Sequence, residues 1–231
     1  EKNLTEGSVL NNVVLFSRPY LLSYFLQTLY GMADLYIIGL YGQTADTTAV
    51  SIGSQVMHML TVMIVGLAMG TTVMVARSVG AKDKEGTAKS VGATVTLFSV
   101  VALALTIVLL FSAEGIAKIM STPSEAFSGT VSYLMICFAG VPFITAYNII
   151  GSVFRGMGDS KSPMYFIAVS CVINILLDFL FMGALSMGPA GAALGTNDEK
   201  NSFRRHSDFA SGRVYSDRLH RHHSLCQQAR A

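Results

Sequence analysis

The sequence predicts an all-α polytopic membrane protein, and three observations support this class. Of its 231 residues, 52% are hydrophobic and only 13% are charged, about half the charged fraction of a typical soluble domain. The apolar residues fall into runs of about 20 or more, the length that crosses a hydrocarbon core about 30 Å thick. The connections between the runs alternate between rich and poor in lysine and arginine. Together these features predict about five transmembrane helices plus the start of a sixth.

Five apolar segments are long enough to span a bilayer. Their approximate bounds are Val13–Tyr41, Thr48–Val75, Val91–Phe111, Val131–Phe154 and Met164–Leu185. A sixth segment begins at Gly188 with GPAGAALGT. These spans must be helices, because lipid offers no partner for backbone polar groups and the alternation of a barrel strand is missing. Gly140 and Pro142 interrupt the fourth segment and predict a bend there.

Positive charge gathers in every second connection. The connections after the second and fourth segments hold Arg77, Lys82, Lys84, Lys89, Arg155 and Lys161. The connections on the other side hold one lysine, Lys118. By the positive-inside rule the N-terminus is cytoplasmic. We therefore expect a multi-pass protein of a prokaryotic plasma (inner) membrane, with the lipid bilayer as its first partner.

The composition changes abruptly at Asn197. Residues 1–196 hold nine lysines and arginines and ten acids, whereas residues 197–231 hold seven and four, with four of the five histidines. Each charge at bilayer depth costs about 2.5–3.5 kcal/mol, so these residues cannot complete a sixth span. We expect a transmembrane lobe at 1–196 and a polar basic tail, disordered or out of frame, at 197–231. A reading-frame shift or truncation near Thr196 explains the change; a natural cytoplasmic or interfacial tail is the alternative.

The composition and motifs exclude several functions. The nearly neutral body offers no basic surface for nucleic acid. The chain contains no phosphate loop, dinucleotide fingerprint or nucleophile elbow, so we expect neither an enzyme nor an ATP-driven pump. No cofactor is expected beyond a coupling ion. The tail cluster of His220, His222, His223 and Cys226 has no second ligand pair at zinc-finger spacing, and we predict no resident metal there.

Two further residues have weaker functional interpretations. Gly156-Met157-Gly158-Asp159 matches the GxGD pattern of intramembrane aspartyl proteases. Their chemistry needs a second catalytic aspartate inside the membrane, whereas Asp159 is expected in a cytoplasmic loop. His58 lies within the second span without an acidic residue in the same segment, and we expect a packed polar residue.

Two acidic residues lie well inside predicted spans, where an ionisable side chain is expensive and usually functional. Asp34 and Asp178 each lie about seven residues before the outer end of their segments. At about 1.5 Å per residue both lie roughly 10 Å below the outer boundary. Because the first and fifth segments run in the same direction, the two carboxylates can face one cavity.

Polar neighbours share the helix faces of these acids. Ser170, Asn174 and Asp178 follow at intervals of four and form one stripe. Gln27 and Tyr30 share a face with Asp34 by the same rule. Such a pair of carboxylates can exchange protons near neutral pH or, when ionised, bind a sodium ion. In the alternative interpretation each acid only forms hydrogen bonds between helices.

Four motifs in order resemble the multidrug and toxin extrusion (MATE) family. PYLLSYFLQTLYGMADLYIIGLYG resembles the first helix of these transporters, and AMGTTVMVARSVGAKDKEGTAKSVG resembles the end of their second helix and the following loop. FRGMGDSKSP is similar to their fourth-to-fifth loop. NILLDFLF followed by GPAGAALGT is similar to helix five and the start of helix six. The resemblance covers nearly all of residues 10–196.

The resemblance implies twelve helices in two six-helix lobes, of which this chain is the N-terminal lobe. It implies a secondary active antiporter that exports small cationic or amphipathic drugs in exchange for protons or sodium. The residues matching the family's N-lobe site are Asp34, Asn174 and Asp178 for the coupling ion, and Gln27, Tyr30, Asn148, Ser170 and Thr196 for the cavity. Asp34 and Asp178 are the residues where sodium would bind.

The chain departs from the family pattern in two ways. Many relatives follow the helix-five aspartate with proline, whereas this chain has Phe179. The second, C-terminal lobe is missing, and alternating access works by one lobe moving against the other. We therefore expect the fragment to be inactive alone. Two alternatives stay open: a lipid-linked precursor flippase of related fold, and a non-transporting membrane fragment.

Overall fold

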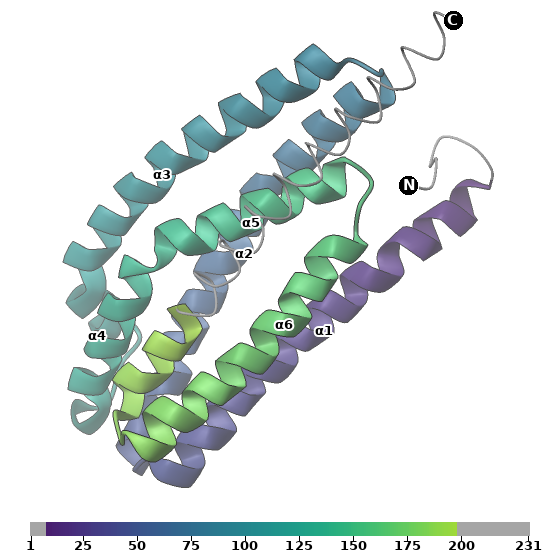
Figure 1. The fold of residues 1–231 in the computed structure, drawn as a ribbon. Coiled ribbons are helices and arrows are strands. Elements are labelled where there is room, and N and C mark those ends of the chain that lie inside the picture. Colours follow the sequence, from purple (N-terminus) through teal and green to yellow (C-terminus); the bar gives the residue numbers. More distant parts are fainter. Residues whose placement is uncertain (1–7, 198–231) are drawn as a thin grey trace, which may run out of the picture.

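The computed structural model describes residues 8–197, and these form an elongated bundle of helices (Figure 1). The helices are α1 (Val9–Tyr41), α2 (Thr44–Gly80), α3 (Lys84–Ile119), α4 (Ser124–Ala139), α5 (Val141–Gly156), α6 (Lys161–Asp178) and the π-helix η1 (Phe179–Ala184). Residues 188–197 are also helical. Within residues 8–197 there is no strand. The predicted all-α class is confirmed.

The number of membrane-length helices agrees with the sequence. Four helical stretches are long and apolar enough to cross a membrane: α1, α2, α3, and α6 continued by η1. The interrupted fourth segment corresponds to α4 and α5, which are bent by 49° at their junction and make a fifth span when the bent pair is counted as one. The other four predicted spans are confirmed, and so is the predicted bend in the fourth.

The helices extend beyond the predicted bounds. The second span was expected at Thr48–Val75 and the third at Val91–Phe111, but α2 has 37 residues and α3 has 36. At about 1.5 Å per residue each is roughly 55 Å long, well beyond a hydrocarbon core of about 30 Å. Hydropathy marks only the apolar part of a helix, whereas the polar ends continue into the headgroup region and are fixed by their own caps.

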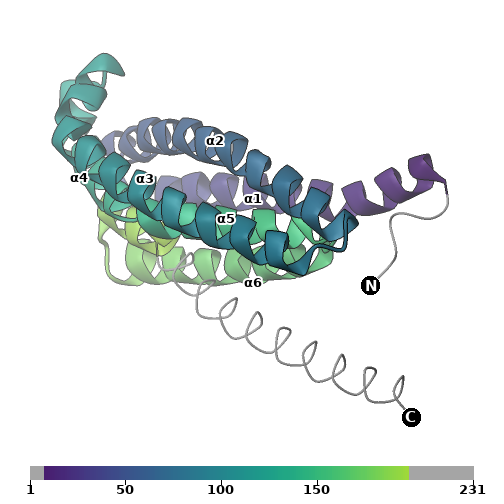
Figure 2. The same ribbon diagram turned by 90° about the horizontal axis from the view of Figure 1, so that it is seen from above.

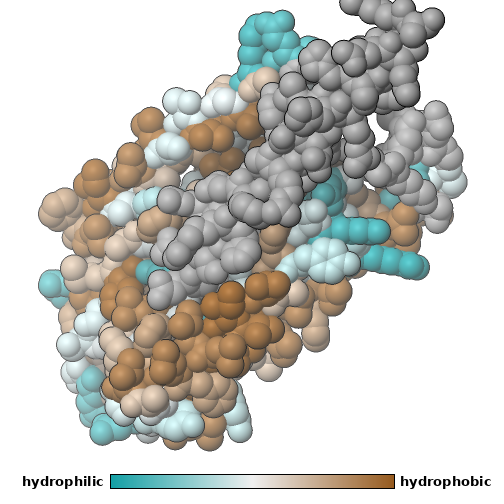
Figure 3. Space-filling view, in the orientation of Figure 1, coloured by the Kyte–Doolittle hydropathy of each residue, from teal (hydrophilic) through white to brown (hydrophobic). Residues whose placement is uncertain are grey.

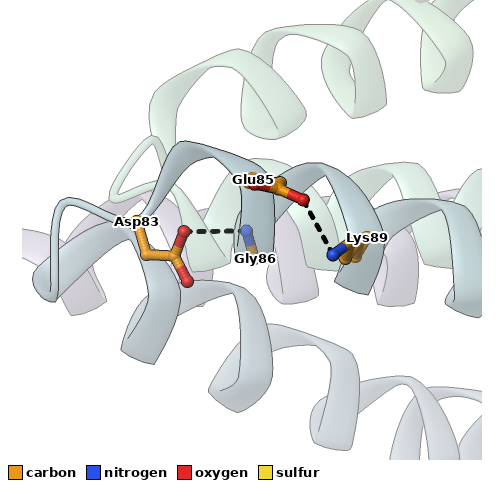
Figure 4. A network of polar contacts seen from close by, with 4 residues as sticks. All are labelled: Asp83, Glu85, Gly86 and Lys89. Atoms are coloured by element: carbon orange, nitrogen blue, oxygen red, sulfur yellow. Dashed lines mark hydrogen bonds and ion pairs between the residues drawn. The ribbon is translucent and has the colours of Figure 1, made fainter.

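The start of α3 illustrates such a polar end (Figure 4). The Asp83 carboxylate accepts a hydrogen bond of 2.9 Å from the backbone N–H of Gly86, a helix N-cap. One turn further, the ion pair between Glu85 and Lys89 joins exposed side chains at 2.8 Å. An exposed pair at this spacing stabilises a helix by about 0.3–0.5 kcal/mol. The predicted basic connection between the second and third spans is therefore mostly helical.

The bend between α4 and α5 has a local cause. Pro142 has no backbone N–H, so it cannot bond the carbonyl four residues earlier. Beside the bend, the Asn197 side-chain amide donates to the Ile136 carbonyl at 2.7 Å. A Cβ on Gly140 would overlap this amide. Asn197, which the sequence groups with the polar tail, is thus the last described residue and belongs to a helix that contacts the bundle, while the rest of that tail (198–231) lies outside the described residues.

The connections between helices alternate between the two ends of the bundle (Figure 1). The start of α1, the α2–α3 connection and the α5–α6 connection lie together; we name this the N-terminal end. The α1–α2 and α3–α4 connections lie at the opposite end. The two basic connections therefore share one end, as predicted. Figure 2 shows the same bundle from above, with α1 beside α6 and with α2, α3, α4 and α5 packed against one another.

The hydrophobic core lies at the opposite end. It is built from the last turns of α1 and α3, the first half of α2, and the residues on both sides of the α4–α5 bend. Its largest fully buried side chains include Ile37, Ile38, Leu134, Phe138 and Ile144. Buried side chains toward the N-terminal end, among them Val75, Phe154 and Ile167, lie outside this cluster.

The outer surface is strongly apolar. In the space-filling view, hydrophobic residues cover the middle of the visible face and hydrophilic residues gather toward the ends (Figure 3). Phe111 and Ile119 on α3 are 90% and 82% exposed. Such a surface is costly in water and suits a chain whose helices contact lipid or further helices.

We predict that Gly53→Ala destabilises the bundle. The added Cβ would lie inside the Tyr133 ring, so α2 and α4 must separate, at a cost of about 1–3 kcal/mol. Gly66→Ala and Gly70→Ala are matched controls on α2, because nothing lies within 4 Å of their built Cβ atoms. Alanine's higher helix propensity should make them neutral or stabilising by up to about 1 kcal/mol. Unfolding in detergent measures the difference, and equal stability of all three variants would contradict the packing.

Candidate functional site

The polar stripe predicted on the fifth span is buried. On α6, Ser170 is 3% exposed, and Asn174 and Asp178 are both 0% exposed. Their spacing of four residues places them on one face, which α6 turns toward the bundle and away from lipid. This part of the prediction is confirmed. Both polar atoms of the Asn174 side chain are buried without a hydrogen-bond partner among the described residues.

The helical segment 188–197 covers this stripe. A Cβ on Gly195 would overlap the Asp178 carboxylate and would lie 3.8 Å from the Asn174 amide nitrogen. A glycine is therefore required at this contact. The next residue, Thr196, is 7% exposed, and its hydroxyl donates to the Ala192 carbonyl at 3.0 Å. The sequence analysis gave Thr196 a place in the site, but it did not predict the role of Gly195.

The register between α1 and α6 places Asp34 at the level of Asp178. The Leu26 carbonyl contacts the Cys171 sulfur, 145 positions later in the chain, at 3.9 Å. Near the ends of both helices, the Tyr41 ring packs on Gly183, 142 positions later, and stacks edge-to-face on Phe179. Asp178 follows Asp34 by 144 positions. This separation lies between those of the two contacts, 145 and 142 positions, so the two acids lie at about the same level. Asp34 itself is 4% exposed.

Asp34 also has a neighbour across the bundle that the sequence analysis missed. The buried Tyr133 on α4 interacts electrostatically with Asp34, and its hydroxyl shares a 3.1 Å hydrogen bond with Ser54 on α2. The Tyr133 ring lies directly on Gly53. In the sequence, the only signs of this contact were a tyrosine in the middle of one span and a Gly-Ser pair in another. Spacing within one segment cannot reveal a contact between two segments.

The remaining predicted cavity residues lie on α1 and α5. Gln27 is half-buried and its amide donates to the Tyr147 hydroxyl on α5 at 3.3 Å. Tyr30 is half-buried on α1. Asn148 is buried on α5, where its amide donates to the Ile144 carbonyl of its own helix at 2.8 Å. The structure therefore groups Asn174, Asp178 and the Gly195–Thr196 turn, and places Gln27 against α5.

A π-helix follows Asp178 immediately. The backbone N–H of Phe179 donates to Ile175, and further along Leu185 N–H reaches back five residues to the Leu180 carbonyl at 3.0 Å. A proline at 179, as in many members of the resembling family, would lose the first of these bonds. π-helical turns occur preferentially at functional sites. The sequence predicted one span over Met164–Leu185, and hydropathy alone does not distinguish a π-helical turn within it.

Two of the weaker interpretations can be settled. Asp159 accepts hydrogen bonds from the backbone N–H of Lys161 at 3.0 Å and of Ser162 at 3.1 Å. It also accepts one from the Ser162 hydroxyl at 2.6 Å, so it caps α6 outside the spans and does not form a protease site. His58 was expected to be packed, but it is exposed on α2. Within the described part of the chain, no three His, Cys, Asp or Glu residues are grouped to hold a metal ion.

Comparison with known proteins supports the family resemblance found in the sequence. The MatE family model matches residues 19–180. The probable multidrug resistance protein YpnP of Bacillus subtilis is 34% identical over 195 residues, which cover 84% of this chain and 44% of that protein. The multidrug export protein MepA of Staphylococcus saprophyticus is 28% identical, covering 83% of this chain and 42% of that protein. The chain thus spans less than half the length of these relatives.

Solved structures agree in fold and extent. A MOP superfamily transporter from Pyrococcus furiosus superposes with a TM-score of 0.83 at 27% identity, covering 90% of this chain and 47% of that one. A multidrug resistance MATE family transporter in an outward-facing conformation gives 0.80 at 27% identity, covering 90% and 45%. The chain therefore belongs to the MatE family and corresponds to the N-terminal half of its transporters.

Proposed function

We propose that this chain is the N-terminal lobe of a secondary active antiporter that exports cationic or amphipathic drugs in exchange for protons or sodium. The observation that carries the proposal is a pair of buried carboxylates, Asp34 and Asp178, at one level of neighbouring helices. Ionisable groups at this depth are rarely kept unless they bind or relay an ion. The names of the relatives support drug export as the purpose.

Asp34, Asp178 and Asn174 form the proposed coupling-ion site. Hard cations take oxygen ligands from carboxylates and side-chain amides, and these residues supply five such oxygens. A proton on one carboxyl group would relieve the repulsion between the two acids in the same way as a bound sodium ion. Burial of the Asn174 amide oxygen without a hydrogen-bond partner among the described residues favours a role in binding an ion.

The proposed drug-binding residues are Gln27, Tyr30, Asn148, Ser170 and Thr196. All are half-buried or buried in the described bundle. Because an ionised Asp34 or Asp178 attracts a cation, a drug cation and the coupling ion would compete for the same negative charge. That competition is the simplest physical route from ion entry to drug release, since each ligand can shift the equilibrium only by its differential affinity.

Transport requires a second lobe, which we propose as the principal protein partner of this chain. The relatives are about twice as long, and alternating access needs one lobe to move against another. In this proposal the protein lies in a prokaryotic plasma membrane with its N-terminal end in the cytoplasm, because the basic connections lie at that end. It catalyses no covalent chemistry.

The alternative is a flippase of related fold for a lipid-linked precursor. One observation favours keeping it. The Pyrococcus furiosus neighbour is described as having a binding pocket of reverse polarity that suggests a different function. Membership of this fold therefore does not by itself determine the cargo.

The first prediction concerns drug export. In cells without other multidrug exporters, the complete two-lobe protein should lower the accumulation of a cationic dye, and Asp34→Asn or Asp178→Asn should abolish this effect, because neither amide can carry the exchanging charge. Glu114→Gln is the matched control, since Glu114 is exposed at the end of α3. Dye export by both aspartate variants at the parent rate would exclude the coupling site. The flippase would be favoured if the protein had no effect on growth with the dye and the aspartate variants lost precursor flipping instead.

The second prediction concerns ion binding by the lobe alone. If sodium is the coupling ion, replacing potassium by sodium at constant ionic strength should raise the free energy of unfolding by about 1–3 kcal/mol, as for a ligand at several to 100 times its dissociation constant. Asp178→Asn and Asn174→Ala should remove this increase, and Glu114→Gln should retain it. An increase that persists in both site variants would place the ion elsewhere. No increase in the parent would indicate protons as the coupling ion.

A further inference from the structure

Arg155, near the end of α5, has unusual surroundings for a charged side chain. Its Nη2 donates to the Ser152 hydroxyl at 2.8 Å, and its Cζ lies 5.7 Å from the centre of the Tyr20 ring on α1. Its Nε is buried without a hydrogen-bond partner among the described residues. Within 8–197 the only ion pair is Lys89–Glu85, so no carboxylate of these residues neutralises the guanidinium. The aromatic face of Tyr20 is therefore a principal partner of the charge.

The arginine is fixed to one side of the bundle. Ser152, which holds its guanidinium, is fully buried, and the Ser152 carbonyl accepts a 3.1 Å hydrogen bond from the Thr72 hydroxyl on α2. Directly after Arg155, a Cβ on Gly156 would lie 2.8 Å from the Val75 Cβ and 2.9 Å from the Thr72 carbonyl. The end of α5 is thus packed closely on α2, and the arginine cannot follow α1 if α1 moves.

Tyr20 belongs to a helix that otherwise stays apart from α5. Among the described residues, no Cα atom of α1 lies within 8 Å of one in α5. Two side-chain contacts bridge the helices: Tyr20 with Arg155, and Gln27 with Tyr147. Along α1 the contacts are seven residues apart and along α5 eight, or about 10 and 12 Å. The earlier residue on α1 pairs with the later residue on α5, so the two contacts join antiparallel helices at successive levels.

The first two thirds of α1 bury few side chains. Among the described side chains of residues 8–33, only Ser23 is buried, whereas the core is concentrated at the opposite end. Pro19, inside the helix, cannot donate to the carbonyl of Leu15. This stretch packs along α6, where the buried Cys171 contacts the Leu26 carbonyl. On the side that faces α5, by contrast, it has no close backbone approach.

We propose that the Tyr20–Arg155 contact is a latch that holds α1 against α5 and closes the N-terminal end of the lobe. Breaking the contact lets α1 swing away from α5 while the packed opposite end stays in place. The latch is an equilibrium between a closed state that contains the cation–π contact and an open state that lacks it. It does not depend on which ion or cargo the transporter uses, so its failure and that of the antiport proposal are separate results.

The test measures a distance between α1 and the fixed body. Spin labels at Leu15 and Val79, both 40% exposed, report the separation by pulsed electron resonance, with Cys137, Cys171 and Cys226 replaced by serine. The 231-residue chain is used in lipid nanodiscs. Tyr20→Leu should increase the open-to-closed ratio about two- to fivefold, the change equivalent to one cation–π contact at a partly exposed site. Tyr20→Phe keeps the ring and should match the parent.

Two comparisons make the result specific. Tyr24→Leu is the matched control, because Tyr24 lies one turn further along α1 and its ring is 57% exposed. Arg155→Met should open the lobe as Tyr20→Leu does, and the double variant should open it no further than either single one. Arg155→Lys, a milder change, should give a smaller shift, and circular dichroism confirms equal helix content. Unchanged distances in both single variants, additive effects, or an equal effect of Tyr24→Leu would overturn the latch.

Discussion

Polar groups inside this lobe must find partners within the protein, because a hydrocarbon environment offers none. The backbone meets this constraint by forming helices throughout residues 8–197 outside short connections. Serine and threonine hydroxyls meet it locally: those of Ser23, Thr61, Thr106 and Thr130 donate to the carbonyl four residues earlier. Such residues can therefore occupy apolar spans at little cost. The ionised carboxylates of Asp34 and Asp178 have no hydrogen to donate to such a carbonyl, so the cost of their burial is concentrated at one site.

Close helix contacts depend on glycine at a few positions. Gly53 admits the Tyr133 ring, Gly156 admits α2, and Gly195 admits the Asp178 carboxylate. In each case a methyl group would overlap a neighbour. By contrast, the Gly66 and Gly70 pair, which has the spacing of a helix-packing motif, meets nothing within the described bundle. The glycines that matter are identified by the atoms opposite them, and not by their spacing along the chain.

Packing is uneven along the bundle, and this has mechanical consequences. The opposite end contains the large buried side chains and the edge-to-face contact between Tyr41 and Phe179. The N-terminal end lies outside this cluster, and polar contacts such as Thr72 with Ser152 and Arg155 with Tyr20 contribute to its packing. A well-packed region resists deformation, whereas a region with few buried contacts opens at low cost. The acids lie toward the rigid end, while movement of α1 is expected at the other.

The sequence by itself determined the membrane class, the five spans, the bend at Gly140–Pro142, the shared end of the basic connections and the burial of the α6 stripe. These follow from hydropathy, from the missing N–H of proline and from the four-residue period of a helix, all of which are local properties. Only the tertiary structure decided that Gly195 covers Asp178, that Tyr133 contacts Gly53 and Ser54, that Asp159 caps α6, and that Arg155 reaches Tyr20. It also placed the π-helix after Asp178 and exposed His58. These features depend on which faces of distant helices meet, and the period of one helix carries no information about its neighbour.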